Sequence, residues 1–227
     1  MKALSKAKVL VFGIGGVGSY VVEALARCGV GSLTLVDAAA VSDNNINCQL
    51  GALHSTVGKY KTEVAKERIK DIDTNILVNT YQTFYSLETS SFFDFAGYDY
   101  IVDAVDTIAS KLLIIEQAKA NKVAVISCMG TENRLDPSRF EITDISKVSI
   151  CPIAKMISLE LRKRKIRKVK VLYSKERPIK LIEMMDEAKA DTVTPIVGSI
   201  VFVPAIAGLM IANEVVKELI AIRNKDK

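Results

Sequence analysis

The sequence has few of the residues that build zinc sites. Among its 227 residues there is one histidine, and the four cysteines stand at positions 28, 48, 128 and 151, where no two form a C-x-x-C pair. This spacing argues against a zinc knuckle. His54 lies in an expected loop, and we expect it to be structural rather than a general base. No signal peptide precedes the cysteines, so we expect reduced thiols and a cytoplasmic location.

Long apolar runs are also scarce. The one that needs attention, 195–212, approaches the roughly 20 residues of a membrane span. Residues 196–203 are rich in β-branched side chains, and Pro204 suits the first position of a helix. We therefore expect a buried strand over 196–203 and a buried helix over 205–220, with no membrane segment.

The composition is that of a soluble globular protein. Apolar residues make up 49% and charged residues 25%, and the net charge of +5 permits an anionic partner without requiring one. We expect a single domain over 1–227.

Strand and helix patterns alternate through the first half of the chain. We expect strands at 9–12, 33–36, 76–81, 98–102 and 123–127, and helices at 17–28, 59–71 and 108–120. This alternation predicts an α/β fold, a Rossmann-like doubly wound sheet that is mostly parallel. Further on, a strand near 138–142, a helix near 152–164 and a strand at 168–173 predict an α+β extension of the same sheet, and 184–194 is expected to be a loop.

A glycine motif follows the first expected strand. Gly13, Gly15 and Gly18 fit G-x-G-x-x-G, and Asp37 follows nineteen positions after Gly18. Gly13 would allow the tight turn, Gly15 the close approach of a phosphate, and Gly18 the packing of helix on strand. The helix N-terminus then offers free N–H groups to an anion. We expect a nucleotide site.

Polar residues further along indicate which kind of nucleotide chemistry to expect. A dehydrogenase needs neither the polar run 44–49 nor a lysine at 61 after the Gly58-Lys59 pair. Amide groups donate to phosphate oxygens, a lysine neutralises a leaving group, and a carboxylate such as Asp106 holds magnesium. These residues favour a triphosphate over a dinucleotide.

The chain resembles the ThiF/MoeB superfamily of ubiquitin-activating-enzyme-like adenylating enzymes. The resemblance rests on V-F-G-I-G-G-V-G-S-Y at 11–20, L-V-D at 35–37, N-I-N-x-Q at 45–49, G-K-x-K at 58–61 and D-A-V-D-T at 103–107. Further pieces are similar to the bacterial tRNA threonylcarbamoyladenosine dehydratase branch: A-L-H-S-T-V-G-K at 52–59, L-D-P-S-R-F at 135–140, D-I-S-K at 144–147, C-P-I-A at 151–154 and S-I-V-F-V-P-A at 199–205. The sulfur-carrier-activating branches usually carry zinc pairs, which this chain lacks.

The resemblance implies ATP-dependent adenylation of a carboxylate on tRNA, followed by ring closure and loss of AMP. It assigns the nucleotide to Gly13, Gly15, Gly16 and Gly18, and the ribose hydroxyls to Asp37. It further implies that Asn45 and Gln49 contact ribose or phosphates. Lys61 would contact the α-phosphate and the departing pyrophosphate, and Asp106 would bind Mg²⁺. Asn45 as a turn cap and Lys61 as a solvated helix lysine are the structural alternatives. Asp103 is expected to be structural. A homodimer is also implied.

Three features depart from the family pattern. Cys48 replaces the arginine of N-I-N-R-Q, and Ala39 replaces the second aspartate of D-x-D. Relatives also carry residues ahead of the first strand, often with an arginine that reaches the partner's ATP. Because cysteine cannot replace bidentate contacts to phosphate, we expect weak ATP binding and slow adenylation. A reactive Cys48 thiol is the other interpretation.

A basic run provides a candidate surface for tRNA. Its expected contacts are Arg162, Lys163, Arg164, Lys165, Arg167 and Lys168, and the alternative is a solvated helix end. Nearby aromatics such as Tyr173 give little sign of base stacking. Two other functions stay open: adenylation of a ubiquitin-like sulfur carrier, with a carrier or desulfurase partner, and a nucleotide-binding protein with weakened catalysis.

Overall fold

The computed structural model describes residues 3–148, 151–179 and 198–225. Its sheet contains the strands β1 (Lys8–Phe12), β2 (Ser32–Val36), β3 (Leu77–Tyr81), β4 (Tyr100–Asp103), β5 (Ala124–Cys128), β6 (Phe140–Asp144) and β7 (Lys170–Ser174). The helices are α1 (Gly16–Arg27), α2 (Lys61–Ile72), α3 (Ile108–Ala120), α4 (Pro152–Lys163) and α5 (Phe202–Lys225). Single-turn 3₁₀ helices lie in the connections.

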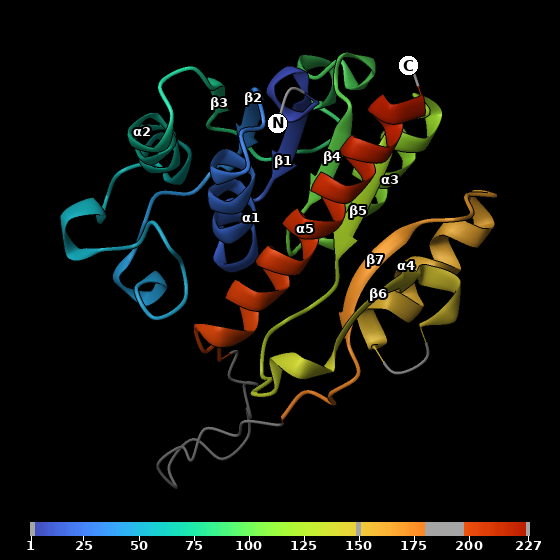
Figure 1. The fold of residues 1–227 in the computed structure, drawn as a ribbon. Helices are drawn as coiled ribbons and strands as arrows, with labels where there is room; N and C mark the ends of the chain where they lie inside the picture. The colour runs from blue at the N-terminus through green and yellow to red at the C-terminus, as the bar shows by residue number, and fades with distance from the viewer. Residues whose placement is uncertain (1–2, 149–150, 180–197, 226–227) are drawn as a thin grey trace, which may run out of the picture.

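The sheet has the order β3-β2-β1-β4-β5-β7-β6 and is parallel except for β6, which runs antiparallel to β7 (Figure 1). The predicted doubly wound sheet and its extension are therefore confirmed. The strand order reverses between β1 and β4, and in such sheets the crevice for ligands opens beyond the carboxyl ends of these two strands.

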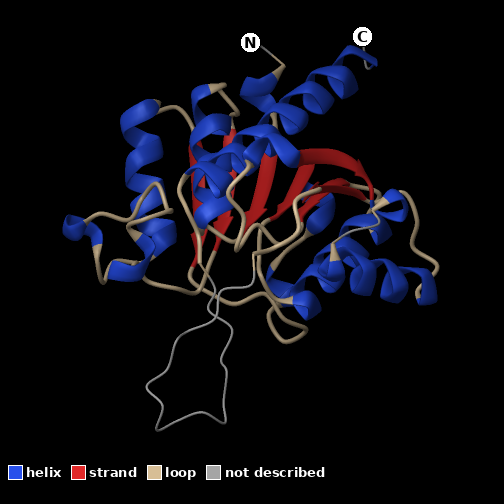
Figure 2. Cartoon of the chain, turned by 90° about the horizontal axis from the view of Figure 1, so that it is seen from below, coloured by secondary structure: helices blue, strands red, loops and turns tan. Residues whose placement is uncertain are grey.

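Alternation along the strands explains why helices cover both faces (Figure 2). Val9 and Val11 pack with apolar residues of α1 and α5, whereas Leu10 and Phe12 pack with Ile114 and Ala118 of α3. Every second side chain of a strand points to the same face, so β1 is apolar throughout because it is buried on both sides. A separate cluster joins α4 to β7 and α3.

Helix α5 packs closely against α1 and carries the last part of the chain back to the glycine loop. A Cβ added to Gly208 would lie 2.5 Å from the carbonyl oxygen of Val17, so the two helices are in close contact there. Pro204 lies within 3.0 Å of the Cβ that Gly16 would have. The first and last helices therefore meet beside the crevice.

The expected strand over 196–203 is wrong in the part that the structure describes. Residues 198–200 are irregular, Val201 is an exposed turn residue, and α5 already begins at Phe202. Val203 is buried as part of α5, among apolar residues of α1. Its apolar character therefore comes from helix packing and not from a strand. The rest of the expected strand, and the expected loop at 184–194, lie outside the described residues. In the described part of the chain, no helix has the length and apolar character needed to cross a membrane.

Candidate nucleotide-binding site

The glycine loop leaves β1 and enters α1 with almost no spare room. Gly13 adopts a φ of +84°, and a Cβ there would lie 2.5 Å from the carbonyl oxygen of Ala104. A Cβ on Gly18 would lie 1.8 Å from the carbonyl oxygen of Gly13. Because real Cβ atoms do not approach backbone so closely, both positions require glycine for packing. Gly15 and Gly16, the other two predicted glycines of the loop, line an open cleft, as does Gly13.

This cleft has a volume of about 370 Å³, within the range of small-molecule sites. It lies at the carboxyl ends of β1, β2 and β4, where the expected crevice opens. Several of the predicted site residues line it together, namely Gly13, Gly15, Gly16, Asp37, Gln49, Lys61 and Asp106. The fold thus brings together residues that are up to 93 positions apart in the sequence (106 − 13 = 93).

Asp37 is fixed at the end of β2 by two backbone donors. The backbone N–H of Ile14 donates to one carboxylate oxygen at 2.7 Å, and that of Ala39 donates to the other at 2.8 Å. Asp37 therefore ties the glycine loop to the end of β2, and its acceptor oxygens are held beside the cleft. A carboxylate in this place suits hydrogen bonds from ribose hydroxyls.

Only the last two residues of the polar run 44–49, Cys48 and Gln49, line the cleft. Asn45 is not among the lining residues, and its side-chain oxygen instead accepts the backbone N–H of Ser42 at 3.1 Å. This bond caps the 3₁₀ helix η2 (Asp43–Asn45), which supports the turn-cap alternative. A ligand contact by Asn45 stays a prediction.

Lys61 reaches the cleft from the first residue of α2. Its backbone N–H donates to the carbonyl oxygen of Ala39 at 3.1 Å, and Ala40 forms an antiparallel bridge with Tyr60. These bonds join the start of α2 to the end of β2. Lys61 therefore lines the same cleft as Asp37, which the solvated-lysine alternative would not require.

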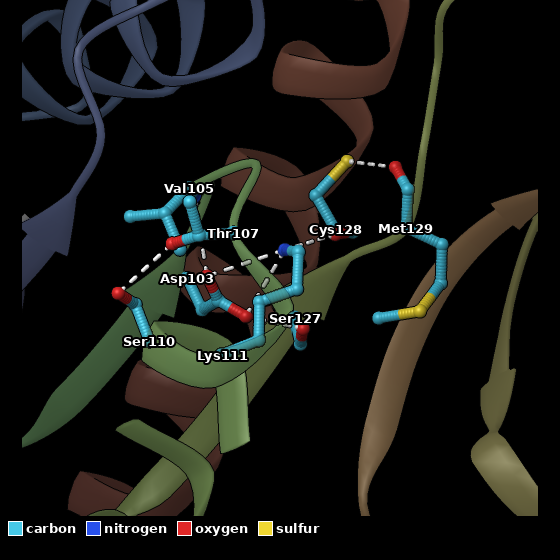
Figure 3. Close-up of polar contacts among 8 residues, drawn as sticks. All are labelled: Asp103, Val105, Thr107, Ser110, Lys111, Ser127, Cys128 and Met129. Atoms are coloured by element: carbon cyan, nitrogen blue, oxygen red, sulfur yellow. Dashed lines mark hydrogen bonds and ion pairs between the residues drawn. The ribbon is translucent and has the colours of Figure 1, made fainter. Parts of the chain in front are cut away.

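A buried ion pair anchors the loop after β4 (Figure 3). The ammonium of Lys111 in α3 lies 3.2 and 3.3 Å from the two carboxylate oxygens of Asp103 and donates to the carbonyl oxygen of Cys128 at 2.5 Å. The hydroxyl of Ser127 also donates to Asp103, which in turn accepts the backbone N–H of Val105 at 3.2 Å. Asp103 is thus a structural residue, as its sequence context predicts, and it fixes the start of the loop that carries Asp106.

A second network holds the same loop from the other side. The hydroxyl of Thr107 donates to Ser110 at 2.9 Å, and that of Ser110 donates to the carbonyl oxygen of Tyr85 at 2.7 Å. Hydroxyl contacts of this kind link the start of α3 to the segment after β3. Together with the ion pair, they give Asp106 a fixed place at the cleft.

Glu132 is a cleft residue that the sequence analysis missed. It follows β5 and lines the cleft with Asp106. The pKa of the Asp106 carboxyl group is raised, first because the cleft removes it from water and then because the Glu132 carboxylate faces it. Lys111 and Lys61 act in the opposite direction. The nearby lysines do not fully offset the negative charge of these two carboxylates. Their oxygen atoms are therefore ligands suited to a hard divalent cation.

Comparisons with known proteins agree with this geometry. The family model described as "ThiF family" matches residues 1–227. The tRNA threonylcarbamoyladenosine dehydratase of Bacillus subtilis (strain 168) is 43% identical, over 97% of this chain and 89% of its own. That of Haemophilus influenzae is 44% identical over 70% of this chain and 61% of its own.

Among solved structures, Escherichia coli TcdA, a tRNA N6-threonylcarbamoyladenosine dehydratase in complex with ATP, superposes with a TM-score of 0.87 at 28% identity. The superposition covers 100% of this chain and 90% of TcdA. The chain belongs to the ThiF family.

Two of the three departures from the ThiF pattern, Cys48 and Ala39, lie at the cleft. Cys48, in place of arginine, is half-buried there, and burial raises the pKa of its thiol. A hydrogen bond with Ser199 and the charge of Lys61 lower that pKa without offsetting the burial. The activated thiol considered from the sequence is therefore not supported. Ala39 contributes only its backbone, to Asp37 and Lys61.

The basic run lies at the opposite end of the sheet from the cleft. It covers the end of α4 and the connection to β7. Because β7 runs parallel to β5, the basic run lies at the amino ends of the strands. Lys165 and Lys168 have left-handed φ values of 59° and 58° and turn the chain back. Arg162, Arg167 and Lys168 line a surface hollow of about 470 Å³. Within one subunit, the structure does not bring the predicted tRNA residues to the predicted ATP residues.

Proposed function

We propose that this protein uses ATP to dehydrate and cyclise the threonylcarbamoyladenosine of tRNA, by adenylating its carboxylate. The observation that carries the proposal is the convergence of Gln49, Lys61 and Asp106 on the cleft beside the glycine loop. That polar set is what a triphosphate needs and a dinucleotide does not. The two dehydratases named above, at 43% and 44% identity, support the choice of substrate.

Each of the cleft residues is proposed to bind a different part of ATP. Gly15 and Gly16 leave room for phosphates at the start of α1, where free N–H groups favour an anion. The Asp37 carboxylate accepts hydrogen bonds from the ribose hydroxyls. The side-chain amide of Gln49 donates hydrogen bonds to ribose or phosphate oxygens. Lys61 lies where it can neutralise charge on the α-phosphate and on the departing pyrophosphate.

The reaction needs no nucleophile from the protein. The substrate carboxylate attacks the α-phosphorus of ATP, and pyrophosphate leaves as the acyl–phosphate bond forms. A nucleophile within the same threonylcarbamoyl group then attacks the activated carbonyl carbon, closes the ring and expels AMP. Holding the two reacting groups together favours this internal step over attack by water. The substrate loses the elements of water overall, while ATP becomes AMP and pyrophosphate.

Asp106 and Glu132 are the residues that would hold Mg²⁺ with the nucleotide. Within the described residues, no group of three or more His, Cys, Asp or Glu side chains could hold a metal ion alone. Mg²⁺ commonly takes one or two carboxylates and completes its ligands with substrate phosphates and water, which fits this pair. When bound, it would neutralise phosphate charge.

We further propose that residues 1–227 act as one adenylating domain in a cytoplasmic homodimer. Phe202, Ile206 and Leu209 of α5 are apolar and exposed on the side that faces away from α1. They follow one another at spacings of four and three residues, so they form one stripe of the helix. A second copy of this chain is the occupant that we propose for this stripe. The basic run is proposed to contact tRNA phosphates.

The decisive experiment measures AMP release with ATP and three candidate acceptors. These are tRNA that carries threonylcarbamoyladenosine, the same tRNA without the modification, and a ubiquitin-like carrier protein. We expect AMP only with the modified tRNA, together with a tRNA product lighter by the mass of one water. Release with the carrier would instead indicate a sulfur-carrier adenylyltransferase; the protein named "Adenylyltransferase and sulfurtransferase UBA4" of Candida glabrata is 38% identical over 58% of this chain. ATP binding without release would indicate a catalytically weakened protein.

A further inference from the structure

A second hollow continues from the nucleotide cleft along the outer side of α3. Its volume is about 640 Å³, and it shares Phe84, Tyr85 and Ser110 with the cleft. The shared residues place the mouth of the cleft at one end of this groove. Its wall on α3 runs from Ile108 to Glu116, a distance of about 12 Å at the rise of an α-helix.

The groove is apolar where it leaves the cleft. Phe84 is 53% exposed and Leu87 is 79% exposed, and both belong to the segment that follows β3. Leu112 and Leu113 of α3 contribute to its lining. A connected apolar surface that opens from a ligand site marks a binding surface more often than chance exposure does.

The far end of the groove reaches the basic run. Arg164, a member of the basic run, lines it and pairs with Glu116 at 2.7 Å. Both side chains are well exposed, so this ion pair is weak and Arg164 remains available to a phosphate. Glu88 and Glu116 are the acidic residues of the lining. The groove therefore connects a cleft for a triphosphate to the basic end of the molecule.

We infer that this groove binds the single-stranded nucleotides next to the reacting adenosine of the RNA substrate. The inference rests on the proposed function. The adenosine must bring its carboxylate to the α-phosphate inside the cleft, so the neighbouring nucleotides must leave the cleft, and the groove beside Phe84 opens directly from it. Single strands bind where bases stack on aromatic or apolar side chains and basic residues follow the backbone.

This path also gives the basic run a place in the same complex. The cleft and the run lie at opposite ends of the sheet, and the groove along α3 joins them on one face. The sequence around the basic run gives little sign of base stacking, and the fold supplies the exposed ring of Phe84 from a distant part of the chain. The RNA backbone is the occupant whose charge suits both Arg164 in the groove and the basic run beyond it.

The test places opposite charges at one exposed groove position. Leu87→Glu and Leu87→Lys remove the same apolar side chain, and Leu77→Glu and Leu77→Lys are the matched controls at an exposed leucine on the edge strand β3. Affinity for threonylcarbamoyladenosine-containing tRNA is measured by fluorescence anisotropy at fixed salt, and ATP affinity by calorimetry. We expect Leu87→Glu to weaken tRNA binding about tenfold and Leu87→Lys to preserve it, because the phosphate backbone is anionic. Both Leu77 variants should match the wild type, and ATP affinity should not change.

Each other outcome has a definite meaning. Equal weakening by Leu87→Glu and Leu87→Lys would indicate an apolar partner contact, and no change with either would show that RNA does not pass here; both overturn the inference. If the wild type releases AMP with modified tRNA while the variants behave normally, only the groove is wrong. If the wild type neither binds the modified tRNA nor releases AMP, the proposed function fails and the groove inference fails with it.

Cross-linking gives an independent readout. With 4-thiouridine beside the modified adenosine, we expect cross-links to the segment 84–88 or to 109–116. Cross-links confined to other parts of the chain would overturn the inference.

Discussion

Two lysine ion pairs at opposite ends of the sheet show how differently the cleft and the basic run are built. Lys111 lies 3.2 Å from Asp103, with side chains only 3% and 0% exposed. Lys163 lies 2.5 Å from Glu160, with side chains 71% and 39% exposed. The shorter pair is the weaker one, because water screens it and both side chains lose freedom on pairing. Geometry is fixed at the cleft, whereas the basic run supplies charge on a solvated surface.

The sharpest test of this contrast replaces each lysine by methionine. Lys111→Met leaves the buried Asp103 carboxylate without its positively charged partner, which should lower the free energy of unfolding by about 3–5 kcal/mol. Lys163→Met should lower it by less than about 1 kcal/mol. Urea unfolding of both variants measures the difference. Adding Asp103→Asn to Lys111→Met should restore part of the loss, and equal losses for the two single variants would contradict the contrast.

The next largest effect is expected on catalysis at the cleft. Lys61→Ala removes the cleft lysine that we propose neutralises the departing pyrophosphate, so AMP release with modified tRNA should fall by about 10²–10³-fold. Lys70→Ala, on an exposed turn of the same helix, is the control and should behave as the wild type. Unfolding curves should be the same for both. If Lys61→Ala releases AMP at a rate close to that of the wild type, Lys61 is a solvated helix lysine without a catalytic role.

A gain of activity should follow from restoring the family arginine. Cys48→Arg places a permanent, bidentate donor in the cleft, and we expect pyrophosphate release to rise by roughly tenfold or more. Cys28→Arg introduces the same side chain at an exposed position at the end of α1 and should change nothing. Unchanged release on restoration would mean that other groups of the cleft already replace the arginine.

The smallest effect is expected at the basic run, where no single contact dominates. Reversing Arg162, Arg164 and Arg167 to glutamate should weaken tRNA binding by about tenfold near 0.1 M salt, and the dependence of affinity on salt should become less steep. ATP affinity should stay the same because the run lies at the far end of the sheet. Binding that keeps its affinity and its salt dependence would rule out the run as a tRNA surface.

The parts of the fold that depend on local patterns were predictable. The glycine loop, Asp37 and the alternation of strands and helices were sufficient for the parallel sheet, because each signal lies within about thirty residues. The run 196–203 misled because its β-branched residues are typical of a strand, and only the contact of α5 with α1 reveals a helix beginning at Phe202.

The cleft was predictable only where a motif covered it. Gln49, Lys61 and Asp106 line it as their motifs indicate, whereas Glu132 and Phe84 belong to no such motif and reach it through the order of the strands. Asn45 shows the opposite case, since a motif residue is engaged in capping its own turn. Local hydrogen bonds compete for short polar side chains, and sequence spacing does not tell which partner is bound.

The contact between α5 and the glycine loop also bears on when the protein becomes competent during its synthesis. The nucleotide motif leaves the ribosome well before Ser199 and Pro204, which line the same cleft, are made. A nascent chain that has folded its first strands therefore still lacks one wall of the cleft. Only a chain that has been translated through α5 can close the cleft around ATP, so a truncated product would carry the recognisable motif without a finished nucleotide site.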